Sequence, residues 1–370
     1  MSSSQTPSAP APSPRNTGLD RARAVAVIAM VMGHTLDAVL SEQARDGVGV
    51  IAYWSMRAVT APLFLFVAGW AFATTVQRTG AHGASVLRRY VPRVALLLGW
   101  GYLLRWPGWG LPALFAGDPG VWRHFLAFDA LHGVAGALLL GAGVLALLPG
   151  RTARMVTLLG LAVLFPLVSP GLRAAVAAGG WPLALEQALV ARTSNFPLFP
   201  WASYFFVGGL TGLALAGVKR VPHWLCLMGT GTAMLALMAL WGGDPKVSDP
   251  TLVLWRVGLL SVVAGLAMLL PSRLDGMMGP VGRASLWVYV VHLPIAYGWS
   301  TFQGLASRLG HSQDVLPALG LALSVLAVSL FIALPAKRLY GRWRRKGGTP
   351  ELAARAVASA AVLPEPPVSG

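Results

Sequence analysis

The sequence has little charge and almost no cysteine. Of its 370 residues 11% are charged and 55% are hydrophobic, and the mean hydropathy is +0.64. Soluble domains carry about a quarter charged residues, so the composition excludes a water-soluble globular enzyme. The lone Cys226 excludes an intrachain disulfide and a cysteine-based metal cluster. The sequence also lacks a Walker motif, zinc-ligand spacing and a Gly-x-Ser-x-Gly elbow. We therefore expect a multi-span membrane protein without a metal site or a permanently bound cofactor.

Acidic residues are scarcer than basic ones. The 13 Asp and Glu face 29 Lys and Arg, which gives a formal net charge of +16 and a pI near 11.2. In a soluble protein this balance would indicate nucleic acid. Here the basic residues lie between long apolar runs, so we predict a membrane-lipid environment and no nucleic-acid partner.

The apolar runs predict an all-α, polytopic membrane helix bundle. Residues 1–18 are poor in apolar side chains and predict a disordered tail, residues 19–340 form the membrane domain, and residues 341–370 form a basic and then disordered tail. The first apolar run continues without a cleavage site, so we expect it to be retained. A spanning helix needs about 20 apolar residues. Ten segments approach that length, near 22–40, 57–76, 91–111, 125–148, 154–170, 197–217, 222–241, 251–270, 284–303 and 315–335.

The loop charges predict the orientation. Lys and Arg concentrate in cytoplasmic loops. Ten spans with both termini inside place 20 of the 29 basic residues on the inner side and 9 of the 13 acidic residues on the outer side. The inner face then holds the whole positive excess. We therefore expect a multi-pass protein of the cell (cytoplasmic or inner) membrane.

The first span carries ionisable residues at membrane depth, where they are functional hypotheses by default. Arg23 and His34 are eleven residues apart, about 17 Å along one face of a helix. Asp37 follows one turn later. An imidazole can act as general base toward a hydroxyl or an amine, and a carboxylate nearby would fix its tautomer. We expect His34 and Asp37 to be catalytic; the alternative is a structural histidine in an interhelical hydrogen bond.

Polar residues also gather at the outer ends of several spans. Asp129 and His132 lie three residues apart on one helix face, and Arg57, Arg105 and Asn195 end other helices on the same side. Together they predict a pocket for an acceptor substrate that opens to the outside. The alternative is simple solvation of residues at helix ends.

The ninth span carries a second histidine. His292 shares a face with Ser285 and Tyr289, and Pro294 after it should loosen the backbone hydrogen bonding. His292 is a candidate for catalysis or for lining a passage from the inside, and a packing role is equally open.

Glycines recur inside the apolar runs, and small residues there let helix backbones approach closely. We expect this packing role, and no phosphate loop, for two groups: Gly133, Gly136, Gly141 and Gly143 in one span, and Gly208, Gly209 and Gly212 in another.

Four ordered motifs carry a family resemblance. The stretch LDRARAVAVIAMVMGH at 19–34 resembles the opening motif of the membrane acyltransferase superfamily. Three more look like the prokaryotic branch of the heparan-alpha-glucosaminide N-acetyltransferase catalytic family: APLFLFVAG at 61–69, FPLFPWASYFFVGG at 196–209 and GRASLWVYVVH at 282–292. Ala24 departs from the usual Gly. The stretch ending at Gly69 lacks the Ser-Gly pair of the sister acyltransferase-3 family, which favours the N-acetyltransferase-like branch. The acceptor does not follow from the family name.

The resemblance implies an integral membrane acyltransferase. It would move an acetyl or acyl group from cytoplasmic acyl-CoA, its co-substrate, to a hydroxyl or amine of an extracytoplasmic sugar or glycan. Arg23, Arg88, Arg89 and Arg93 would hold the nucleotide phosphates, with His292 in the same donor site. His34 would deprotonate the acceptor or carry the acyl group as an acyl-imidazole.

A second class of function fits part of the same pattern. Intramembrane His, Asp and Arg also build proton relays in transporters and flippases. The two halves of the chain show no clear repetition, which many transporters have. Transport without any need for acyl-CoA would favour this alternative.

Overall fold

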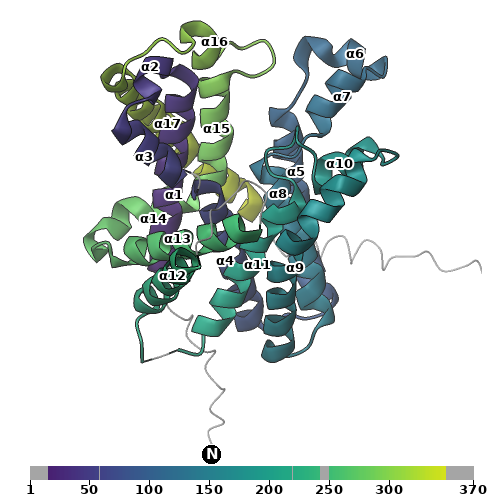
Figure 1. Ribbon diagram of the computed structural model, residues 1–370, viewed down its shortest axis with the longest axis vertical. Helices are drawn as coiled ribbons and strands as arrows, with labels where there is room; N and C mark the ends of the chain where they lie inside the picture. Colours follow the sequence, from purple (N-terminus) through teal and green to yellow (C-terminus); the bar gives the residue numbers. More distant parts are fainter. Residues whose placement is uncertain (1–15, 58, 219, 242–249, 347–370) are drawn as a thin grey trace, which may run out of the picture.

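The chain folds into a helical bundle (Figure 1). The computed structural model describes residues 16–57, 59–218, 220–241 and 250–346, and over these ranges the chain contains helices and no strand. The all-α, polytopic fold class is thereby confirmed. The ends of the two predicted tails, 1–15 and 347–370, lie outside the described residues; within them, α1 starts at Thr17 and α17 runs to Lys346.

Each predicted span corresponds to one helix. These helices are α1 (Thr17–Val39), α4 (Thr60–Thr79), α5 (Ala84–Leu104), α8 (Ala130–Leu147), α9 (Arg151–Ala177), α11 (Leu198–Leu215), α12 (His223–Leu240), α13 (Pro250–Leu269), α15 (Ser285–Tyr297) and α17 (Val315–Lys346). Shorter helices connect them: α2 (Glu42–Arg45), α3 (Val48–Arg57), η1 (Gly108–Gly110), α6 (Leu111–Phe115), α7 (Pro119–Leu126), α10 (Leu183–Leu189), η2 (Ser272–Leu274), α14 (Asp275–Arg283) and α16 (Leu305–Leu309).

Within the described ranges, eight of these helices are long and apolar enough to cross a membrane, and the exceptions are α5 and α15. The predicted span at 91–111 is displaced, because α5 already begins at Ala84 with an arginine-rich first half that an apolar window rejects. The predicted span at 284–303 is too long. Helix α15 has 13 residues and ends at Gly298, whose φ of 94° is a conformation that glycine adopts readily.

Helices α4 and α11 pack with their backbones in contact. A Cβ atom on Gly208 would lie 1.9 Å from the Phe66 carbonyl oxygen, and one on Gly69 would lie 1.9 Å from that of Phe205. Gly133, Gly136, Gly141 and Gly212 likewise face neighbouring side chains or backbone at short range, whereas Gly143 faces open space. Most of the expected glycine contacts are therefore present, and they place two of the motif stretches against each other.

Arg21 fixes the start of α1. Its guanidinium donates to an Asp275 carboxylate oxygen (Nη2 to Oδ2, 2.9 Å) and to the carbonyls of Met268 (2.9 Å) and Leu270 (2.6 Å). The hydrogen bonding from Arg21 to Asp275 lowers the pKa of the Asp275 carboxyl, with the Arg21 charge adding to the effect. The first turn of α1 is thus joined to the turn between α13 and α14.

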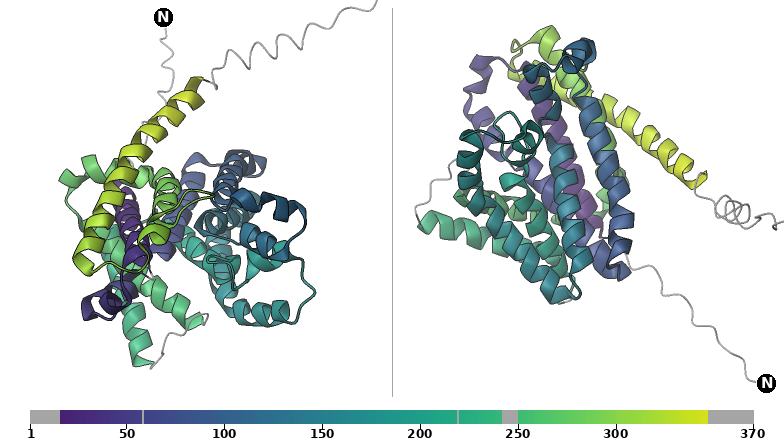
Figure 2. Two further views of the ribbon diagram at one scale, coloured as in Figure 1. Left: turned by 90° about the horizontal axis from the view of Figure 1, so that it is seen from above. Right: turned by 90° about the vertical axis from the view of Figure 1, so that its right-hand side faces the viewer.

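The remaining spans complete the bundle around these contacts. Helices α1, α15 and α17 lie side by side on one side of the molecule, and α5, α8, α9 and α11 lie on the other (Figure 1). The second half of α17 extends beyond the other helices (Figure 2). This arrangement leaves a cavity between α1 and α15 on one side and α5 and α8 on the other.

Candidate active site

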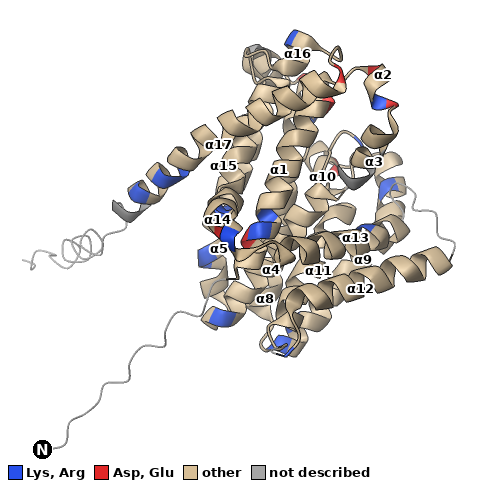
Figure 3. Cartoon of the chain, turned by 90° about the vertical axis from the view of Figure 1, so that its left-hand side faces the viewer, with Lys and Arg blue, Asp and Glu red and all other residues tan. Residues whose placement is uncertain are grey.

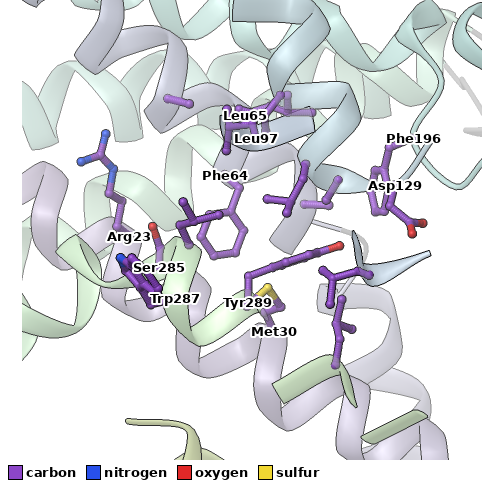
Figure 4. Close-up of a pocket in the computed structure, with 18 of the residues that line it drawn as sticks. Arg23, Met30, Phe64, Leu65, Leu97, Asp129, Phe196, Ser285, Trp287 and Tyr289 are labelled. Atoms are coloured by element: carbon purple, nitrogen blue, oxygen red, sulfur yellow. The ribbon is translucent and has the colours of Figure 1, made fainter. Parts of the chain in front are cut away.

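A cavity of about 2270 Å³ extends along the bundle, lined mainly by α1, α4, α5, α8 and α15. Figure 4 shows Arg23 and Asp129 on opposite sides of it, with Met30, Phe64 and Tyr289 between them. We refer to the part lined by Arg23, Arg78, Arg89, Arg93, Arg283 and Lys337 as the Arg23 end. The part lined by Arg105, Asp129, Asn195 and Phe196 is the Arg105 end.

The Arg23 end is strongly basic. Among the described residues, its lining holds six cations and one carboxylate, that of the buried Asp20, which is 4% exposed. Arg23 and Arg283 approach this carboxylate at 3.9 and 3.5 Å. Arg89 and Arg93 are exposed, line the cavity and have no carboxylate within ion-pair distance among the described residues. Figure 3 shows Lys and Arg along the end of α17 and near the ends of α5 and α8, away from the acidic residues beside α2.

His34 lies between the two ends and is hydrogen-bonded to a tyrosine that sequence reasoning missed. The Tyr297 hydroxyl donates to Oδ2 of Asp37 at 2.7 Å and lies 3.1 Å from Nδ1 of His34. An ionised carboxylate only accepts hydrogen bonds, so the tyrosine proton points to Asp37 and the tyrosine oxygen accepts from the Nδ1–H of His34. This assignment leaves Nε2 of His34 as the basic nitrogen. Asp37 is joined to His34 through Tyr297.

His292 packs against His34 but does not line the cavity. Their ring centroids are 5.4 Å apart, and the side chain of His292 is fully buried. Its Nδ1 lies 2.8 Å from the Val288 carbonyl oxygen, which can only accept, so Nδ1 carries the proton. Nε2 has no hydrogen-bond partner within the described part of the chain. His292 therefore lies beside the candidate base and away from the arginines with which it was grouped.

Three of the predicted pocket residues meet at the Arg105 end. Arg105 donates twice to Asp129 (Nε to Oδ2, 2.8 Å; Nη2 to Oδ1, 2.9 Å) and once to the His124 carbonyl at 2.7 Å. The Asn195 amide donates to Oδ1 of Asp129 at 3.0 Å. The bidentate ion pair is strong and directional. It neutralises this end and holds the start of α8 to the end of α5.

His132 and Arg88 lie outside the cavity lining. His132 is fully buried below Asp129, accepts that residue's backbone N–H at Nδ1 (3.2 Å) and packs between Tyr102 and Phe128. Arg88 is exposed and does not line the cavity. Arg57 ends α3, and its side chain lies outside the described residues.

Two residues that line the cavity were not predicted from the sequence. Tyr297 comes five residues after His292 and so falls off the stripe of Ser285, Tyr289 and His292. Arg256 lies inside α13 and lines the cavity, and it was not among the predicted site residues. An arginine within an apolar run was the available signal.

The geometry combines a basic end, a histidine with a fixed tautomer and a second, neutralised end in one cavity. Residues 16–335 match the profile of the acyltransferase-3 family, which is described as an acyltransferase domain. The chain belongs to the acyltransferase-3 family. No curated protein matches the chain.

The acyltransferase-3 match covers nearly all of the described helices. The protein is therefore a membrane acyltransferase with multiple spanning helices. The match is to the family that the motif comparison treated as the sister group, and the heparan-alpha-glucosaminide N-acetyltransferase branch has no such support. The missing Ser-Gly pair near Gly69 therefore did not decide between the two families.

Proposed function

We propose that this acyltransferase moves an acetyl or acyl group from cytoplasmic acyl-CoA, across the membrane domain, to a hydroxyl or amine of an extracytoplasmic sugar or glycan. The observation that carries the proposal is the single cavity, whose lining runs from the basic Arg23 end past His34 to the Arg105 end. A donor and an acceptor that enter from opposite ends could meet at His34 without either crossing the membrane.

The donor binds at the Arg23 end. Coenzyme A carries several phosphate charges, and guanidinium groups bind phosphate by charge-assisted, often bidentate hydrogen bonds. Arg23, Arg89 and Arg93 supply such groups from α1 and α5. Arg23 lies eleven residues before His34 on α1, about 17 Å along the helix, so an extended thioester arm that starts at Arg23 has to rise along the helix to reach the imidazole. The loop charges support a cytoplasmic position for this end.

The acyl transfer takes place at Nε2 of His34. This nitrogen accepts the proton of the acceptor hydroxyl or amine while the acceptor oxygen or nitrogen attacks the thioester carbonyl. The carbon–sulfur bond then breaks, and the departing thiolate takes the proton from Nε2 to leave as the free thiol of CoA. Tyr297 and Asp37 hold the imidazole in the required tautomer and stabilise its positive charge in between.

The acceptor binds at the Arg105 end. The Arg105–Asp129 pair and the Asn195 amide present fixed polar groups to the cavity there. The motif resemblance to the N-acetyltransferase branch supports an amino sugar as one acceptor, and a hydroxyl is an equally suitable proton donor to a general base. The test therefore includes both kinds of acceptor, an amine and a hydroxyl.

The test uses acetyl-CoA labelled in the acetyl group and the purified protein in lipid nanodiscs, with an amino sugar and a neutral sugar as acceptors. His34→Ala should lower acetyl transfer by about 100-fold or more, because general-base catalysis contributes that much. His82→Ala is the matched control, since His82 is an exposed histidine between α4 and α5 outside the cavity lining. Equal CoA release by the wild type and His34→Ala would contradict the proposal and favour the transporter alternative.

A second variant tests the hydrogen-bonded chain. Tyr297→Phe removes the hydroxyl that joins His34 to Asp37, and we expect about a 10-fold lower kcat with little change in KM for acetyl-CoA, as for loss of a hydrogen bond to a charged group. The pH dependence of kcat should shift as well, because the imidazole loses its link to the carboxylate. Asp37→Asn should shift the profile in the same direction. A pH profile that neither variant moves would limit Tyr297 to packing.

A further inference from the structure

Arg256 lies deep inside a membrane helix and faces the cavity. It is six residues after Pro250, the start of α13, about 9 Å along the helix axis. Its side chain is half-buried and lines the cavity. A charge at membrane depth is costly and is typically retained where it meets a ligand or a partner. Arg256 needs such an explanation.

The position of Arg256 separates it from the donor arginines. The other end of α13 lies at the Arg23 end, because Arg21 binds the carbonyl of Met268. Arg256 precedes Met268 by twelve residues, about 18 Å along α13. Its guanidinium carbon is 5.5 Å from the centre of the Trp201 ring, and Trp201 packs against Phe196 at 4.6 Å. Phe196 lies beside Asp129 in Figure 4, so Arg256 belongs to the acceptor side of the cavity.

Among the residues that the structure describes, Arg256 has no counter-ion. Arg105 is neutralised by Asp129, and Asp37 is paired with Arg45 at 3.7 Å. The guanidinium of Arg256 lies over the Trp201 ring, and neither its Nε nor the nearby Tyr204 hydroxyl has a hydrogen-bond partner in the described part of the chain. Within the described ranges, no carboxylate lies within ion-pair distance of Arg256. On the acceptor side, the described residues therefore leave the charge of Arg256 without a carboxylate partner.

We propose that Arg256, held over Trp201, binds a single anionic group on the acceptor, so that the enzyme acylates an acidic sugar. The proposal rests on the proposed acyl transfer and names the class of its acceptor. A guanidinium stacked on an aromatic face keeps its N–H groups available at its edge, where they match the two oxygens of a carboxylate or a phosphodiester. The single charge of Arg256 matches a singly charged group. The multiply charged donor is instead matched by the several cations of the Arg23 end.

The experiment measures sugar binding without any donor, by quenching of tryptophan fluorescence in nanodiscs. The probes are methyl β-glucuronide, methyl β-glucoside and the methyl phosphodiester of glucose, which share the sugar and differ in the anionic group. We expect the wild type to bind an anionic probe about 10-fold more tightly than the glucoside, as for a hydrogen bond between charged groups. Arg256→Gln should abolish this ratio, and Arg256→Lys should keep part of it.

Arg308→Gln is the matched control, because Arg308 also lies over an aromatic ring (Phe302, 5.8 Å) but does not line the cavity. It should retain the wild-type ratio. Thermal unfolding of each variant shows whether the fold is intact. Whichever anion binds more tightly identifies the oxyanion as carboxylate or phosphate. Equal binding of all three probes by the wild type, or an unchanged ratio in Arg256→Gln, would overturn the proposal. Acetyl transfer is measured separately, so failed transfer with intact anion selectivity would count against the proposed function alone.

Discussion

The two ends of the cavity contain the same kind of residue in opposite electrostatic states. At the Arg105 end the guanidinium donates two hydrogen bonds to the Asp129 carboxylate, which also accepts one from the Asn195 amide. At the Arg23 end the described lining has six cations and one carboxylate, that of Asp20, which Arg23 and Arg283 approach. An arginine that is already paired builds the fold, whereas an arginine that faces open space can bind an anion. The comparison predicts that removing an arginine lowers stability at the Arg105 end and lowers donor affinity at the Arg23 end.

The largest effect should come from the Arg105 end and should appear as lost stability. Arg105→Ala leaves the Asp129 carboxylate without its partner, and both side chains are mostly buried, at 10% and 22% exposed. Breaking such a pair by removing one member costs about 3 kcal/mol. Thermal or denaturant unfolding in nanodiscs measures the loss.

The double variant Arg105→Ala/Asp129→Asn serves as the control for this prediction. It removes the uncompensated charge, so it should recover part of the stability lost in Arg105→Ala. A single variant as stable as the wild type would show that Asp129 finds another partner and that the Arg105 end is not held by this pair.

The next effect belongs to the Arg23 end and should appear as lost affinity. Arg89→Gln/Arg93→Gln removes two exposed cations from the cavity lining. We expect the Kd for acetyl-CoA to rise about fivefold, because exposed ion pairs contribute up to about 1 kcal/mol each. The rise should shrink at high salt, which screens exposed charges.

Arg88→Gln is the matched control for the donor site. Arg88 is exposed on the same helix turn but does not line the cavity, so its removal should leave the Kd for acetyl-CoA unchanged. Isothermal titration of acetyl-CoA into the wild type, Arg88→Gln and the double variant separates the effect of general surface charge on the Kd from that of the cavity lining. Equal losses in Arg88→Gln and the double variant would mean that donor binding depends on overall charge alone.

Much of the helix arrangement followed from apolar runs, and less of the site did. Arg105, Asp129 and Asn195 were grouped correctly because the alternation of spans brings their helix ends to one side of the membrane. His132 satisfied the same rule, yet it turned inward to accept the backbone N–H of Asp129. Spacing along one helix gives the face of a residue, but it cannot say which neighbour occupies that face.

Tyr297 shows the same limit across helices. Its hydroxyl joins His34 and Asp37 from 260 or more residues away in the chain. The contact depends on where α15 ends against α1, and hydropathy predicted that end several residues too late. A short helix that stops at a glycine is determined by tertiary packing, which a single apolar window does not report.

The smallest effect tests a paired arginine that lies next to the proposed donor site in the sequence. Arg21 lies two residues before Arg23, but it binds Asp275 and does not line the cavity. Asp275→Asn should therefore leave the Kd for acetyl-CoA unchanged and slightly lower the thermal stability at neutral pH. Arg21 lowers the pKa of the Asp275 carboxyl in the folded protein, so this carboxylate stabilises the fold above its unfolded pKa of about 3.9 and loses the effect as the pH falls through the lower folded-state value. Unfolding curves of the wild type and Asp275→Asn should thus differ from pH 5 to 7 and converge in stronger acid. A changed Kd at pH 7 would instead show that Arg21 takes part in donor binding, and that pairing does not separate the two kinds of arginine.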